Sequence, residues 1–319
     1  FLRGFKEAIW LAVLLVVSYR TVNVVVIGYE LWQVVQHPEV ITNWRQTLFA
    51  QHGNPLMMVL LAVVLFPKLA LGLSGFETGV AVMPLVAGTG DTDEEILASR
   101  VRNTRKLLTS AAVIMSILLT GSSLVTTLRV PAEAMSAGGE ASGRALAFLA
   151  HRDLGDVFGT IYDVATIGTL WFAGASAMAG LLNLVPQYLP RYGMAPDWAR
   201  ATRPLVLIIT FMALVVTMVF KADVTAQGGA YATGVLMLMT SAAVAVAIAL
   251  PHRRARYVPI AVVFVYTTIV NIIERPEGLQ IATWFIVTIV GASLVSRVAR
   301  STELRIEGIE YDALAEELV

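Results

Sequence analysis

The sequence predicts an all-α integral membrane protein with eight transmembrane helices, one of them broken. Three observations support this fold class: the composition, eight long apolar runs, and the distribution of Lys and Arg between the loops. The 319 residues are 57% hydrophobic and 14% charged, with a mean hydropathy of +0.72. Soluble domains have about 45–50% apolar and about 25% charged residues. The chain therefore has too few charges to cover a water-facing surface.

The apolar runs have the length of membrane spans. A bilayer core about 30 Å thick needs roughly 20 apolar residues in a helix. Runs near this length or longer lie at 7–29, 55–87, 107–128, 158–186, 204–221, 229–250, 257–273 and 278–296. Backbone amides in lipid must be satisfied internally, so we expect helices. The runs are continuous rather than alternating, which argues against a transmembrane barrel.

The positive charges fall mainly on alternate loops. One side, beginning with the N-terminus, holds Arg3, Lys6, Arg100, Arg102, Arg105, Lys106, Arg191, Arg200, Arg203, Arg253, Arg254, Arg256, Arg297, Arg300 and Arg305. The other side holds only Arg45, Arg129, Arg144, Arg152, Lys221 and Arg275. Cytoplasmic loops are enriched in Lys and Arg. The pattern thus predicts a cytoplasmic location for both ends of the chain, in a multi-pass protein of the cell membrane.

The domain organisation follows from these spans. Residues 1–305 form a transmembrane domain, and the acidic segment 306–319 is expected to be a cytoplasmic tail. Loop 30–54 contains Pro38, which suits a helix start, and tryptophans typical of an interfacial helix. Loop 130–157 is rich in Gly and Ala and is expected to be mobile.

The second run is longer than one straight crossing needs, and polar and helix-breaking residues interrupt its middle. The stretch reads Gly72-Leu-Ser-Gly-Phe-Glu-Thr-Gly79. Each glycine costs about 1 kcal/mol relative to Ala in a helix. Unwound backbone at membrane depth survives only inside protein or beside a watery cavity. Transporters use such discontinuous helices to bind ions and substrates near the midplane.

Three stretches together resemble the amino acid–polyamine–organocation (APC) superfamily. Gly72–Gly79 resembles its broken sixth helix. Trp171-Phe-Ala-Gly-Ala-Ser-Ala-Met-Ala-Gly180, continuing to Leu189-Pro-Arg-Tyr-Gly-Met-Ala-Pro196, is similar to its eighth helix and cytoplasmic exit. Gly4-Phe-Lys-Glu-Ala8 is similar to the entry of its fifth helix. The resemblance covers nearly the whole chain and rests on the order and spacing of these stretches.

The resemblance implies a partial five-plus-five inverted-repeat transporter fold. The eight spans would be helices five to twelve, and helices one to four of the same chain, including the first broken helix, would be missing N-terminal partners. The implied function is a secondary active permease that imports an amino acid or related amine by alternating access. We expect proton coupling and no sodium dependence. The implied partners are the lipid bilayer and a small-molecule or cation substrate.

The broken helix supplies most of the predicted substrate-binding residues, which are Gly72, Ser74, Gly75, Phe76 and Glu77. Free carbonyls and the Ser74 hydroxyl would face the substrate, and the dipole of the second half-helix would favour an anionic group. The alternative is a glycine kink packed against a neighbouring helix. Glu77 is also a predicted ion-coupling residue, although it could instead cap the half-helix or pair with a buried cation.

Two further ion-coupling residues are predicted. Arg20 lies inside the first span, where a charge usually faces the protein interior or a cavity. The resemblance implies that sodium-coupled relatives bind sodium near this point of the fifth helix, and that some proton-coupled members place a lysine there. Because arginine does not release its proton, Arg20 would then act as a fixed substitute for sodium. The alternative is an ion pair with a missing helix. Asp163, near the outer end of the fourth span, could line an entry path or simply stand at a helix start.

A second substrate class remains open. The stretch Gly228-Gly-Ala-Tyr-Ala-Thr-Gly-Val235 resembles the tenth helix of the superfamily's potassium importers. Tyr231 and Ser74 could then offer oxygens to a desolvated cation, and the alternative function is K⁺/H⁺ uptake. Close helix packing through small residues would equally explain the stretch.

Other function classes find less support. A membrane enzyme would need clustered acid–base or metal-binding groups, and the four histidines are scattered in loops. There is no phosphate-binding glycine loop for ATP-driven transport and no repeated pore loop for a channel. Net charge is zero, so nothing indicates nucleic acid. We therefore expect no catalytic residues, no metal and no cofactor.

Overall fold

The computed structural model describes residues 6–67, 75, 79, 83, 86–188 and 201–300. Within these residues the secondary structure is helical, and no strand is present. The predicted all-α class is therefore confirmed. The predicted tail 306–319 lies outside the described residues, and so do Gly4 and the resemblance stretch 189–196.

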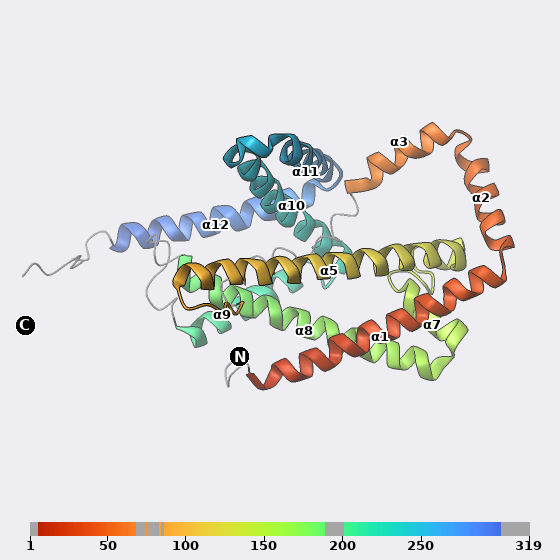
Figure 1. Cartoon of the computed structure of the whole chain (residues 1–319), viewed down its shortest axis with the longest axis horizontal. Helices are drawn as coiled ribbons and strands as arrows, with labels where there is room; N and C mark the ends of the chain where they lie inside the picture. Colours follow the sequence, from red (N-terminus) through yellow and green to blue (C-terminus); the bar gives the residue numbers. More distant parts are fainter. Residues whose placement is uncertain are drawn as a thin grey trace, which may run out of the picture.

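A first group of helices packs around a common core (Figure 1). Its long members are α1 (Lys6–Gln36), α5 (Asp93–Arg129) and α8 (Asp156–Tyr188), with the short helix α7 (Ala145–Leu154) at one end. Buried residues from all four meet in this core, among them Val26 of α1, Val125 of α5, Leu149 of α7 and Tyr162 of α8. The core therefore ties segments that are far apart in sequence.

A second group contains α10 (Val224–Ala249), α11 (Arg254–Glu274) and α12 (Pro276–Arg300). Polar contacts join α10 to α11: the buried Asn271 amide donates to Thr233 Oγ1 at 3.0 Å, and the hydroxyls of Thr240 and Thr268 lie 2.6 Å apart. Helix α9 (Thr202–Val219) contacts α8. The short turn η4 (Pro251–Arg253) joins α10 to α11.

Local signals set several helix ends. Thr92 caps α5 by accepting from the Glu95 amide, and the Glu95 side chain accepts from the amide of Asp91. Asn54 caps α3 (Pro55–Leu65) through a hydrogen bond from the Leu56 amide, with Pro55 at the first helical position. The helix expected after Pro38 is present as α2 (Glu39–His52).

In the described part of the chain, seven helices are long and apolar enough to cross a membrane, and an eighth span would require the pair α2–α3, which bends by 90°. These helices indicate a multi-pass membrane protein. Of the predicted second span at 55–87, the structure describes α3 and the few single residues that follow it.

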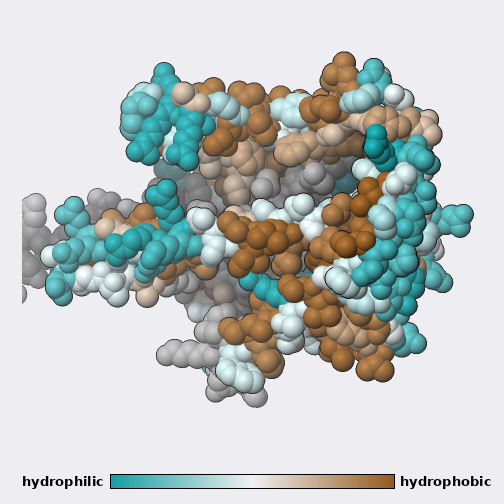
Figure 2. Space-filling view, turned by 45° about the vertical axis from the view of Figure 1, so that its right-hand side comes forward, coloured by the Kyte–Doolittle hydropathy of each residue, from teal (hydrophilic) through white to brown (hydrophobic). Residues whose placement is uncertain are grey.

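The outer surface supports the same interpretation. Large apolar side chains such as Trp10 of α1 and Trp171 of α8 are more than two-thirds exposed, at 71% and 79%. Figure 2 shows apolar side chains across the face of the helices, with hydrophilic residues gathered toward its sides. Apolar surface of this extent needs a non-aqueous covering, which lipid provides.

Two features differ from the sequence prediction: the end of α1 and the structure of segment 130–157. Helix α1 does not end near residue 29 but continues to Gln36, which brings Glu30 into the helix. The segment 130–157 is not a mobile loop. It contains α6 (Ala132–Met135) and α7, and Ala147, Leu149 and Ala150 of α7 are buried in the core. The segment is ordered because its apolar side chains pack against α1 and α8.

Candidate functional site

A cavity of about 530 Å³ lies between α1 and α5. Its described lining comes mainly from the middle of α1 (Val16, Tyr19, Arg20, Asn23, Ile27) and of α5 (Leu107, Leu108, Ala111, Ile114, Met115, Leu118, Leu119, Ser122), with Gly75, Gly79, Leu146 and Thr169. The wall is mostly apolar with a few polar groups, which is the usual character of a small-molecule site.

Arg20 is the one charged side chain among the described residues of this lining. It stands near the middle of α1 and is exposed toward the cavity. A charge at this place in an apolar helix is costly unless water, an ion or a polar ligand reaches it. The predicted ion-coupling residue thus lies on a cavity wall.

The wall beside Arg20 is held by a buried polar contact. Asn23 donates through its amide to the Tyr19 carbonyl oxygen at 2.8 Å, and its Oδ1 accepts from the Tyr162 hydroxyl at 3.1 Å. The Tyr19 and Tyr162 rings lie with centroids 6.4 Å apart. Since Tyr162 belongs to α8, this contact fixes the cavity face of α1 against its neighbour.

Gly75, another predicted site residue, lines the same cavity. Its φ is +96°, a conformation that glycine adopts readily and that interrupts a right-handed helix. The Gly79 amide donates to the Gly75 carbonyl at 3.1 Å, which is the spacing of a helical turn. Glycine also has a packing role at position 79, because an added Cβ would meet the Leu108 side chain at 2.9 Å.

The structure describes only some of the remaining predicted site residues. Gly72, Ser74, Phe76 and Glu77 lie outside the described residues. Tyr231, on α10, is 45% exposed and is not among the described residues that line the cavity. The predicted pairing of Tyr231 with Ser74 therefore stays a prediction.

Asp163 also lies away from the described cavity lining. Its Oδ2 is 3.0 Å from Nε2 of His151, while Nδ1 of the same ring is 3.3 Å from Asp156 Oδ1. The hydrogen bonds with Asp163 and then Asp156 raise the pKa of His151 above its ordinary value. In this arrangement Asp163 fastens α8 to α7.

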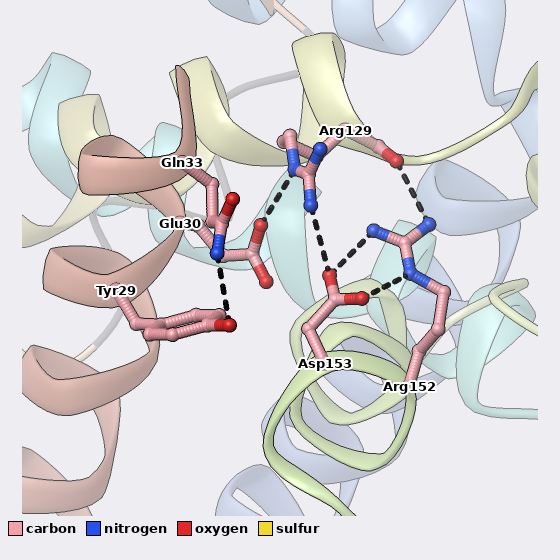
Figure 3. A network of polar contacts seen from close by, with 6 residues as sticks. All are labelled: Tyr29, Glu30, Gln33, Arg129, Arg152 and Asp153. Carbon is pink, nitrogen blue, oxygen red and sulfur yellow. Dashed lines mark hydrogen bonds and ion pairs between the residues drawn. The ribbon is translucent and has the colours of Figure 1, made fainter. Parts of the chain in front are cut away.

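A second polar site, which the sequence analysis did not predict, joins α1, α5 and α7 (Figure 3). Arg129, the last residue of α5, donates through Nε to Glu30 Oε2 at 2.8 Å and through Nη2 to Asp153 Oδ2 at 3.3 Å. Arg152 donates to both oxygens of Asp153, at 2.8 and 2.6 Å, and to the Arg129 carbonyl at 3.0 Å. We call these four residues the Glu30 cluster.

The sequence contained one signal for this cluster. Glu30 follows directly on an apolar run without any break, so a helix extending past residue 29 would carry the carboxylate into the packed part of the molecule. Its partners could not be found in this way, because Arg129 lies 99 residues further along the chain.

Comparisons with protein-family models, curated proteins and solved structures found no match. Among the described residues, no group of three or more His, Asp or Glu side chains could hold a metal ion. The case for a function therefore rests on the cavity and on the Glu30 cluster.

Proposed function

We propose that the chain is a secondary active transporter of the APC superfamily, proton-coupled and sodium-independent, which imports an amino acid or related amine by alternating access. The observation that carries this proposal is the cavity on which Arg20 and Gly75 meet. It lies among helices long enough to span a membrane, where such cavities mark substrate paths.

The lining favours a substrate with an anionic group. A guanidinium donates up to five hydrogen bonds and matches a carboxylate well. The Asn23 side chain and the backbone of Gly75 add polar groups on the same cavity. The rest of the wall is apolar and would suit the hydrocarbon part of an amino acid.

Potassium uptake, the alternative, finds less support. A fixed positive charge at Arg20 repels a cation in the same cavity. Tyr231, which supported the potassium resemblance, is not among the described lining residues. The fixed positive charge of Arg20 would also take the place of a bound sodium ion, which supports sodium-independent transport.

The direct experiment is uptake into proteoliposomes. The protein, expressed from its complete gene, is assayed with a mixture of labelled amino acids and with rubidium, with and without a pH gradient and sodium. We expect saturable amino acid uptake that requires the pH gradient and ignores sodium. Rubidium uptake would support the potassium alternative, and sodium-dependent uptake would overturn the proposed role of Arg20.

Arg20→Gln provides the matching variant. It removes the charge from the cavity, and we expect loss of uptake of about tenfold or more, because one charge-assisted hydrogen bond contributes roughly 1.5–3 kcal/mol. Arg253→Gln, which removes an exposed charge of η4, is the control and should keep its uptake. Equal uptake by the two variants would remove Arg20 from the site.

A further inference from the structure

Glu30 is the most completely buried charged side chain of the described residues. It is 0% exposed, and its only side-chain donor among the described residues is Arg129, which donates to Oε2. The other oxygen, Oε1, is buried and accepts no hydrogen bond from any described residue. A buried carboxylate that lacks donors is costly, because nothing replaces the water it has lost.

The second carboxylate of the cluster is much better supported. Asp153 receives two hydrogen bonds from Arg152 and a third from Arg129. Burial acts to raise the pKa of Asp153, but the hydrogen bonds with Arg152 and Glu30 outweigh it, so that the pKa lies below its ordinary value. Asp153 therefore keeps its negative charge.

The charged groups that face Glu30 come from two elements. Arg129 belongs to α5, and Arg152 and Asp153 belong to α7. Helix α8 also packs on α1, but none of its described charged groups faces Glu30. Glu30 and Asp153 share one guanidinium, because Arg129 donates to Glu30 Oε2 at 2.8 Å and to Asp153 Oδ2 at 3.3 Å. Two carboxyl groups form a hydrogen bond only when one of them carries a proton.

We propose that Glu30 is a reversible proton-binding site. A proton from water adds to the Glu30 carboxylate and converts it to a neutral carboxylic acid, which can donate to Asp153. Arg129 then remains paired with Asp153 alone. Water reaches the cluster through Arg152, whose side chain is 32% exposed, while Asp153 is 16% exposed.

The position of the cluster gives the proton a consequence for the cavity. Ile27 is the last described residue of α1 on the cavity wall, and Glu30 follows one helical turn later. Leu146 of α7, the helix that carries Arg152 and Asp153, lines the same cavity. Neutralising Glu30 weakens the ion pair that joins α1 to α5 beside this end of the cavity. The further statement that this proton drives substrate transport rests on the proposed function.

The proton site is tested without transport, by infrared difference spectroscopy of the purified protein in lipid bilayers. We expect a carbonyl-stretch band of a protonated carboxylic acid that is still present near pH 6, where exposed carboxyl groups with ordinary values of about 4 are ionised. Glu30→Gln removes this band. The control Glu39→Gln removes an exposed carboxylate of α2 and leaves the band in place.

A band that persists in Glu30→Gln would overturn the proposal, and so would its absence from the wild-type protein. Asp153→Asn gives a second test if Glu30→Gln does not fold. Without the neighbouring negative charge, a Glu30 band should disappear at a lower pH than in the wild type. An unchanged transition would contradict the proposal.

The transport arm is separate. With the proposed function, Glu30→Gln should still exchange substrate across the membrane but no longer accumulate it in response to a pH gradient. Accumulation by Glu30→Gln at the wild-type level would show that Glu30 is not the coupled site. An infrared band without any substrate uptake would instead leave the proton site intact and refute the proposed transporter.

Discussion

Replacing Arg129 by Gln should destabilise the protein through a single buried carboxylate. Arg129 bridges two carboxylates, but the loss is unequal, since Asp153 keeps both hydrogen bonds from Arg152. Glu30, 0% exposed, loses its 2.8 Å ion pair. Breaking a buried pair by removing one partner costs roughly 3–5 kcal/mol. Because the Arg129 side chain is itself 19% exposed, and because the unpaired Glu30 carboxylate can take up a proton, we expect the lower end, about 3 kcal/mol.

The assay is thermal unfolding in lipid nanodiscs, followed by tryptophan fluorescence. A loss of about 3 kcal/mol corresponds to a fall in Tm of roughly 4–5 °C for a chain of this size. The double variant Arg129→Gln/Glu30→Gln replaces the ion pair by two neutral amides and should recover most of this loss. Arg45→Gln, on the exposed face of α2, is the control. A double variant that is less stable than Arg129→Gln would refute the reasoning.

Two further predictions concern helix contacts. Gly278→Ala should lower Tm by several degrees, because an added Cβ would meet Thr233 Oγ1 at 2.6 Å where α12 packs against α10. The control Gly291→Ala, on the same helix, adds a Cβ that meets nothing within 4 Å, so its Tm should be unchanged or slightly higher. Equal effects of the two substitutions on Tm would contradict this packing. The hydrogen bonds to Asp163 and Asp156 raise the pKa of His151 in the folded state. The protonated ring therefore stabilises the folded state fully at pH values below the unfolded-state pKa of about 6.5. This stabilisation is lost as the pH rises through the higher pKa of the folded state. The Tm difference between wild type and His151→Gln should therefore be larger near pH 5.5 than near pH 8.5, and a pH-independent difference would contradict it.

The sequence correctly predicted the helical class and most of the spans. These features depend on local properties: the length of each apolar run, the absence of alternation, and caps such as Thr92 at the start of α5. A helix in lipid satisfies its own backbone, so its existence can be inferred without knowing its neighbours. The charge of Arg20 inside an apolar run is likewise a local feature, so the sequence alone reveals it.

The sequence prediction was wrong where neighbours decide the outcome. The segment 130–157 has the composition of a mobile loop, yet α7 forms because Leu149 and its neighbours are buried against α1 and α8. Glu30 looked like a loop residue because the apolar run ends at residue 29. Its burial requires that α1 continue beside α5 and α7, which no local pattern encodes.

The composition and run lengths of this chain thus determined by themselves that it is helical and suited to a membrane. Only the tertiary structure decided which polar groups meet. It placed Arg20 and Gly75 on one cavity, and it paired Glu30 with Arg129, which lies 99 residues further along the chain. The physical reason is that the energy of a buried charge depends on the distance to its partners and on the loss of water, and both are set by packing.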